Sequence, residues 1–316
     1  MTQSLAKKVY ETELATWQGR LSEMMRHPEF KKRALILAFE GSDAAGKGGA
    51  IRRVMSAMDA RQYQIIPIAA PNEEERARPY LWRFWRHMPR LGRVTIFDRT
   101  WYGRVLVERV EGFCSQADWL RAYSEINDFE HDIWRAGGIV VKFWLQISDD
   151  EQLRRFEERA KVEHKRYKIT EEDWRNREKA GAYHEAVCDM VDRTSTGTAP
   201  WTIVESNDKY FARVKVLRTI CERLEKELKI DLAKEPRMVI TRGATDEAGK
   251  DGQPAPAKQA PKTKAERAKE LRAEKARAAK QAKELAASEA REKATAAKEA
   301  KAAKAAENGE KARPTA

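Results

Sequence analysis

The sequence predicts an α/β fold in which a parallel, five-stranded sheet lies between helices. Short apolar runs alternate with segments of helical spacing along most of the chain, and this alternation favours a parallel sheet with helices on both faces. A glycine-rich loop that contains a lysine, residues 41–49, stands between the first apolar run and the helical segment after it. The order strand, glycine-rich loop, helix is typical of α/β domains that bind phosphate.

The predicted strands are the apolar runs at about 33–40, 64–69, 93–98, 139–145 and 201–204. Their lengths suit buried strands better than helices. Pro67 predicts that the second strand lies at an edge of the sheet, because proline cannot donate a hydrogen bond to a neighbouring strand. Helices are predicted at about 4–25, 50–58, 73–87, 104–110, 117–135, 149–159, in a stretch that ends near 193, and at 208–228.

The loop after the first strand is the strongest functional signal. Its backbone N–H groups are expected to form a concave anion site, to which the next helix adds the positive end of its dipole. Glycine permits backbone conformations that a Cβ would obstruct, and a lysine supplies a mobile positive charge. The alternative is an ordinary strand-to-helix turn. The loop consists of Gly41, Ser42, Asp43, Ala44, Ala45, Gly46, Lys47, Gly48 and Gly49.

Two aspartates are candidate ligands for Mg²⁺, with Mn²⁺ as an alternative ion. A Walker A loop usually ends in Gly-Lys-Ser/Thr, and the hydroxyl binds the metal; here that position is Gly48, and we infer that Asp43 takes over its role. Asp98 ends an apolar strand, as in a Walker B segment, and is expected beside the loop at the carboxyl edge of the sheet. Its alternative role is to cap the next helix. Arg99 offers a fork of donors for phosphate.

Basic residues gather in two further segments. In Trp82-Arg83-Phe84-Trp85-Arg86-His87, we predict that the tryptophans are buried and that Arg83 and Arg86 contact anions. Residues 154–168 are rich in both signs of charge. This run is consistent with a basic lid that closes over phosphates and equally with a solvated helix face.

Composition divides the chain into two parts. Residues 1–232 contain all nine tryptophans and are predicted to form one α/β domain. Residues 233–316 form a Lys/Ala/Glu-rich basic tail that we predict to be disordered or transiently helical. The tail supplies most of the net charge of +12. No apolar stretch is long enough for a signal peptide or a membrane span, and three scattered cysteines suggest no disulfide framework. We therefore expect a cytoplasmic protein without membrane contact.

Several blocks of the sequence resemble the polyphosphate kinase 2 family. They span about residues 5–228 and include the unusual loop with Asp43 and Gly48. The resemblance implies a P-loop kinase-like domain, often in homo-oligomers, that transfers phosphoryl groups between inorganic polyphosphate and nucleotides with Mg²⁺. The blocks are residues 41–49, Pro71-Asn72-Glu73-Glu74-Glu75, residues 82–87, Asp98-Arg99-Thr100-Trp101-Tyr102-Gly103-Arg104, Ala199-Pro200-Trp201 and Asn207-Asp208-Lys209.

The resemblance also implies roles for individual residues. Asp43 and Asp98 would bind the metal, and Lys47 and Arg99 would hold phosphates. Arg159 matches the arginine that begins the family's helical lid, which we place at about 160–193. Weaker candidates for a polyphosphate channel are Arg52, Arg53, Arg83, Arg86, Arg104, Lys165 and Arg166.

Residues 168–179 resemble the branch of the family that phosphorylates AMP, although Ala180-Gly181-Ala182 departs from its pattern before Tyr183. The first hypothesis is therefore conversion of AMP to ADP. A polyphosphate-dependent ADP or GDP kinase is the alternative within the family, with GMP and GDP as further acceptors. Outside the family, the alternatives are an ATP-dependent small-molecule kinase and a protein that only binds nucleic acid or polyphosphate. The P-loop and Asp98 argue against binding alone.

Overall fold

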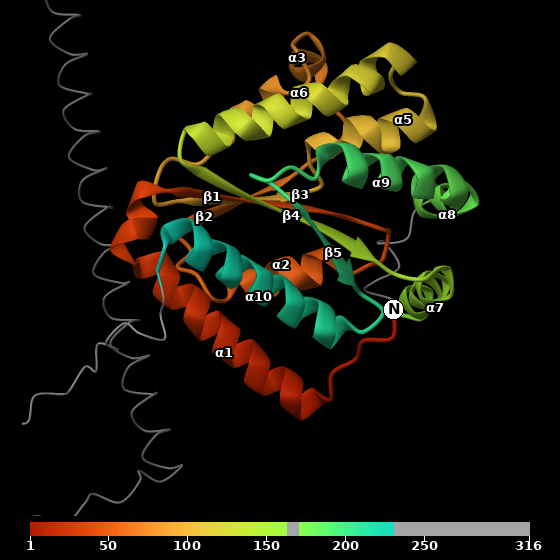
Figure 1. The fold of residues 1–316 in the computed structure, drawn as a ribbon. Helices are drawn as coiled ribbons and strands as arrows, with labels where there is room; N and C mark the ends of the chain where they lie inside the picture. The colour runs from red at the N-terminus through yellow and green to blue at the C-terminus, as the bar shows by residue number, and fades with distance from the viewer. Residues whose placement is uncertain (163–170, 231–316) are drawn as a thin grey trace, which may run out of the picture. The chain divides into compact units, whose positions relative to one another are not determined.

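A computed structural model describes residues 1–162 and 171–230. Its centre is a five-stranded, fully parallel sheet in the order β2-β3-β1-β4-β5, drawn in Figure 1. This confirms the predicted fold class. Pro67 lies in the edge strand β2, as predicted, where its missing N–H disturbs no inner ladder. The strands are β1 (Ala34–Gly41), β2 (Tyr63–Pro67), β3 (Val94–Asp98), β4 (Gly138–Gln146) and β5 (Trp201–Glu205).

Helices cover both faces of the sheet (Figure 1). On one face lie α1 (Lys7–Arg26), α2 (Lys47–Met55) and α10 (Lys209–Leu228). On the other lie α5 (Val107–Glu111), α6 (Gln116–Arg135) and α9 (Ala180–Thr194). Because successive side chains of a strand point to opposite faces, β1 contributes to two cores. Leu35, Leu37 and Phe39 enter the core under α1 and α10, and Ala34, Ile36 and Ala38 enter the core under α6.

The register brings the ends of β1 and its two neighbours to one edge of the sheet. Phe39 of β1 pairs with Asp98 of β3, and Gly41 pairs with Leu145 of β4. The glycine-rich loop, the segment after Asp98 and the start of α7 (Asp149–Lys161) therefore all follow strands that end at the carboxyl edge. This is the edge at which parallel sheets bind ligands.

The predicted helix at 73–87 is wrong. The structure has two short helices there, α3 (Glu73–Arg76) and α4 (Trp82–Trp85). Pro79 separates them, because proline lacks an N–H and disfavours helical backbone in the residue before it. The 104–110 prediction is also revised, to a 3₁₀ helix η2 (Trp101–Val105) followed by α5. Helix α2 begins at Lys47, earlier than predicted.

The prediction that both tryptophans of the basic segment are buried is also wrong. Trp85 is 43% exposed, although its ring meets Phe129 edge-on at 4.7 Å. Trp82 is half-buried, with the guanidiniums of Arg78 and Arg86 over its ring at 4.4 and 5.0 Å. Phe84 is the ring of this segment that enters the core. Cation–π contacts thus replace core packing for Trp82.

The predicted lid region contains the end of α7, then α8 (Glu171–Glu178) and α9. Residues 163–170, with Lys165 and Arg166, and the tail from 231 onward lie outside the described residues. Within the ranges that the structure describes, no helix is long and apolar enough to cross a membrane.

Candidate active site at the carboxyl edge of the sheet

A cavity of about 1270 Å³ opens at the carboxyl edge. Its walls come from the end of β1 and the glycine-rich loop, the 68–84 segment, residues 99–108, and helices α8 and α9. Among the predicted site residues, the cavity is lined by Gly41, Ser42, Asp43, Lys47, Arg83, Arg99 and Arg104. Chain segments far apart in sequence therefore meet around one space, which exceeds the about 300–1,000 Å³ typical of small-molecule pockets.

The loop conformation depends on glycine at two positions. Gly41 has φ +152°, and a Cβ there would lie 2.5 Å from the carbonyl oxygen of Leu145. Gly46 has φ +105° and is the N-cap of α2. The N–H groups of Gly49 and Ala50 bond to the carbonyl of Gly46, so those of Lys47 and Gly48 precede the first intrahelical hydrogen bonds. Such N–H groups are available to an anion.

Lys47 and Arg99 bring positive charge to this end of the cavity. The Lys47 Nζ donates to the carbonyl of Gly41 at 2.6 Å. Arg99 is half-exposed, and its Nη2 lies 3.9 Å from Asp43 Oδ1. Its backbone has φ +64°, a left-handed conformation that non-glycine residues adopt at an energetic cost. The structure thus brings together three of the predicted residues.

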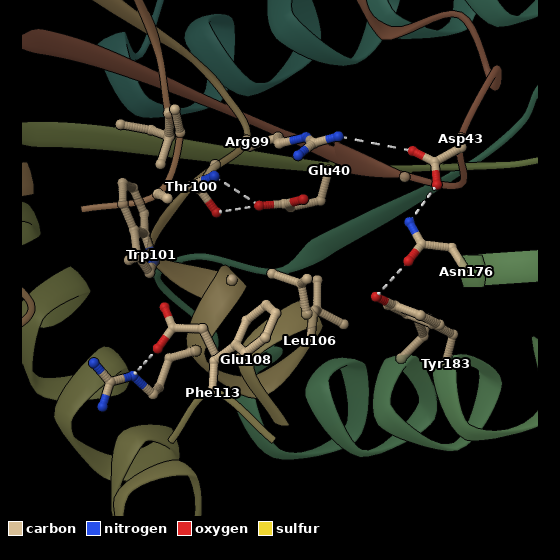
Figure 2. Close-up of a pocket in the computed structure, with 18 of the residues that line it drawn as sticks. Glu40, Asp43, Arg99, Thr100, Trp101, Leu106, Glu108, Phe113, Asn176 and Tyr183 are labelled. Carbon is tan, nitrogen blue, oxygen red and sulfur yellow. Dashed lines mark hydrogen bonds and ion pairs between the residues drawn. The ribbon is translucent and has the colours of Figure 1, made fainter. Parts of the chain in front are cut away.

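Glu40, which sequence reasoning missed, explains how the strained Arg99 backbone is held. Its buried carboxylate accepts hydrogen bonds from the Thr100 N–H at 2.7 Å and the Thr100 hydroxyl at 2.8 Å (Figure 2). Burial raises the pKa of Glu40, while the charge of Lys47 and the bonds from Thr100 oppose the rise. The available sequence signal was a lone acidic residue in an otherwise apolar strand.

Asp43 contacts α8, which lies within the predicted lid. Its Oδ2 accepts a hydrogen bond from Asn176 Nδ2 at 2.8 Å. Asn176 in turn accepts one from the Tyr183 hydroxyl at 3.1 Å. Figure 2 shows this chain, which links the loop, α8 and α9. Asn176 was not predicted as a site residue, although it lies in the 168–179 block that resembles the AMP-phosphorylating branch.

The remaining predicted residues differ in placement. Arg83 donates to the carbonyl of Ala69 at 2.9 Å and pairs with Glu75 at 3.3 Å. Arg104 pairs with Glu108 at 2.7 Å. Both arginines therefore have their charge compensated within the cavity wall. Several predicted residues are not among those that line the cavity: Ala44, Ala45, Gly46, Gly48, Gly49, Arg52, Arg53, Arg86, Asp98 and Arg159.

Apolar and aromatic side chains also line the cavity. Leu106 and Phe113 lie away from Asp43 and Arg99 in Figure 2, and Phe113 is 68% exposed. Tyr80 also lines the cavity. Its hydroxyl oxygen is buried without a hydrogen-bond partner, and burial raises its pKa far above the ordinary value. The loop end is thus suited to phosphate, and the other end combines these apolar and aromatic side chains with the ion pair of Arg104 and Glu108.

A metal ion would find few protein ligands here. Within the described part of the chain, no group of three or more His, Cys, Asp or Glu side chains could hold one. Asp43 lines the cavity, and Asp98 ends the neighbouring strand β3. This fits Mg²⁺, which is commonly bound through one or two carboxylates together with water and substrate phosphates.

Comparison with known proteins places this site in a family. Residues 4–234 match the model of the polyphosphate kinase 2 family. The chain belongs to this family. It is 64% identical over 230 residues to a polyphosphate:AMP phosphotransferase of Pseudomonas syringae pv. tomato, covering 73% of this chain and 46% of that protein. It is 33% identical to an ADP-polyphosphate phosphotransferase of Pseudomonas aeruginosa, covering 70% and 72%.

The fold agrees with a solved member of the family. A crystal structure of a polyphosphate kinase 2 protein from Pseudomonas aeruginosa superimposes with a TM-score of 0.71 at 64% identity, covering 72% of this chain and 50% of that one. The chain thus spans about half the length of the more similar relatives. The family predicted from the sequence blocks is confirmed, while the roles of individual residues stay predictions.

Proposed function

We propose that this protein transfers a phosphoryl group from inorganic polyphosphate to AMP and forms ADP. The observation that carries the proposal is the 64% identity to a protein named as a polyphosphate:AMP phosphotransferase. The protein named for ADP is only 33% identical. The anion-binding groups of the loop, together with the Tyr80, Leu106 and Phe113 side chains elsewhere in the cavity wall, support a substrate that has both phosphate and a nucleobase. An ADP-to-ATP activity is the second candidate, because both activities occur among its relatives by name.

The chemistry requires placement of charged groups more than covalent catalysis. A terminal phosphoryl group of polyphosphate must meet an AMP phosphate oxygen in line. That oxygen is ionised at neutral pH, so no general base is needed. Lys47, Arg99 and the N–H groups of the loop would offset the repulsion between the two anions. Arg159 would bring a further charge as the lid closes.

Asp43 and Asp98 would hold Mg²⁺, or Mn²⁺ in its place. When bound, the ion would supply charge neutralisation on the phosphate oxygens. The carboxylate of Asp43 already lines the cavity, and its Oδ2 accepts from Asn176. A metal at Asp43 would therefore compete with the amide of Asn176. We further propose that the protein works as a homo-oligomer, which light scattering on the full chain would test.

The test is transfer between defined substrates. Purified protein, Mg²⁺ and long-chain polyphosphate are incubated separately with AMP, ADP, GMP and GDP, and the products are separated by chromatography. ADP formed from AMP supports the proposal, and the Lys47→Ala variant serves as the inactive control. ATP formed only from ADP would replace it with the second candidate. Phosphoryl transfer from ATP but not from polyphosphate would refute both.

A further inference from the structure

Arg155 of α7 is a charged residue that the sequence does not distinguish from its neighbours, yet it is only 2% exposed. Its Nη1 donates to the carbonyls of Ala44 at 2.9 Å and Ala45 at 3.1 Å. Its Nη2 donates to the carbonyls of Ser206 at 2.6 Å and Asn207 at 2.9 Å. Its Nε donates to Glu151 Oε1 at 2.5 Å.

These five acceptors match the five N–H donors of a guanidinium. A buried charge is costly unless it is fully paired, so this arrangement is stable only while all the partners stay in place. Lysine has three donors and no planar fork, and it could not reproduce the set. Arg155 therefore joins α7, the glycine-rich loop and the segment between β5 and α10.

The contacts also orient the loop. In a trans peptide the C=O and the next N–H point in opposite directions. Because the carbonyl of Ala45 faces Arg155, the N–H of Gly46 is directed away from it. Gln152, also on α7, donates to the carbonyl of Asp43 at 3.3 Å. Three consecutive carbonyls of the loop, at residues 43–45, thus accept from α7.

The same face of α7 leads to the predicted lid. Residues 148, 152, 155 and 159 are spaced by three or four positions and share one side of the helix. The Ser148 hydroxyl accepts a hydrogen bond from the Asn207 side-chain amide at 3.2 Å. Arg159 follows Arg155 by four positions and so lies on the same side of α7. Because Arg155 connects α7 to the loop, the placement of α7 also sets where Arg159 lies relative to the loop.

We infer that Arg155 is a positioning residue that holds the loop in its phosphate-binding conformation and fixes α7 and Arg159 against it. This inference rests on the proposed function for its substrates. It does not place Arg155 in contact with them. It goes beyond the predicted site, because Arg155 would act entirely through backbone groups on the far side of the loop.

The test compares Arg155→Ala and Arg155→Lys with Arg154→Ala. Arg154 is the matched control: it is the adjacent arginine, 52% exposed, and its partners Glu151 and Glu158 lie on its own helix. We expect Arg155→Ala to lower kcat by about 100-fold, the loss that a small misplacement of reacting groups causes, and Arg154→Ala to stay close to wild type. Added guanidinium ion should restore activity to Arg155→Ala and not to Lys47→Ala.

A second readout does not depend on transfer. Binding of inorganic tripolyphosphate, measured by calorimetry, should be about 10-fold weaker in Arg155→Lys, equivalent to about 1.4 kcal/mol, and unchanged in Arg154→Ala. If wild type binds tripolyphosphate but transfers nothing, the proposed function fails while this difference still tests Arg155. Wild-type binding and kcat in a folded Arg155 variant would overturn the inference. The inference would also be overturned if the loss of activity were not restored by guanidinium and only accompanied a lower urea midpoint of unfolding. If Arg155→Ala does not fold, Arg155→Lys carries the test.

Discussion

Replacing Lys142 by methionine should destabilise the fold strongly. Lys142 and Glu130 are 0% and 1% exposed, and Lys142 Nζ lies 2.8 Å from Glu130 Oε2. Nζ also donates to the Tyr102 hydroxyl at 2.8 Å and to the carbonyl of Thr194 at 2.7 Å. Methionine keeps most of the volume but leaves the carboxylate of Glu130 buried without its countercharge. Breaking such a pair costs about 3–5 kcal/mol, and we expect this range in the free energy of unfolding.

Urea denaturation at pH 7 measures the loss, and Lys215→Met is the control. Lys215 pairs with Glu205 at 2.5 Å, but both side chains are partly exposed, so its loss should stay below about 1 kcal/mol. Burial raises the pKa of Glu130, and Lys142 opposes the rise, so the variant should raise it further. A carboxyl whose pKa is higher in the folded state gains stability as pH falls. The variant should therefore recover part of its loss between pH 8 and pH 5. Equal losses in the two variants, with no pH dependence, would refute the reasoning.

Three further perturbations test the site. Gly41→Ala should abolish tripolyphosphate binding or folding, because its Cβ would lie 2.5 Å from the Leu145 carbonyl oxygen. A folded variant that binds tripolyphosphate in calorimetry as tightly as the wild type would contradict this. Asn176→Ala should tighten Mn²⁺ binding by about 2–10-fold, since it removes one hydrogen bond that competes for Asp43; manganese EPR measures this, and an unchanged Kd would count against Asp43 as a ligand. Excess EDTA should stop transfer from polyphosphate to AMP, and Mg²⁺ should restore it; activity in EDTA would remove the metal from the proposal.

The sheet could be predicted because the three inner strands are mainly apolar runs that are buried on both faces, while the two edge strands are shorter and partly exposed. The 41–49 loop could be predicted because its residue types follow from local backbone geometry. The 73–87 helix was wrong because Pro79 outweighs helical spacing. The burial of Trp85 was wrong because aromatic composition does not determine which face of a short helix meets the core.

Contacts between distant segments could not be predicted from local pattern. The bond from Thr100 to Glu40 spans 60 positions, and that from Asn176 to Asp43 spans 133. Within residues 154–168 the sequence offers similar arginines. The fold nevertheless exposes Arg154 and buries Arg155, because only one of two adjacent helix positions can face the loop. The packing of α7, and not the local sequence, therefore decides which of these arginines contacts the loop.

The position of Asp43 connects these observations. We propose that Asp43 binds the metal in place of the hydroxyl that a Walker A loop carries at the position of Gly48. The early part of the loop must then be as rigid as the start of the helix. The helix end is fixed by its own hydrogen bonds. Residues 43–45 have no such ladder, and Ala44 has φ +61°, a conformation that needs external support. Gln152 and Arg155 provide that support through three consecutive carbonyls. If Asp43 is the metal ligand, as proposed, the support that α7 gives to residues 43–45 accounts for the burial of a charged side chain at Arg155.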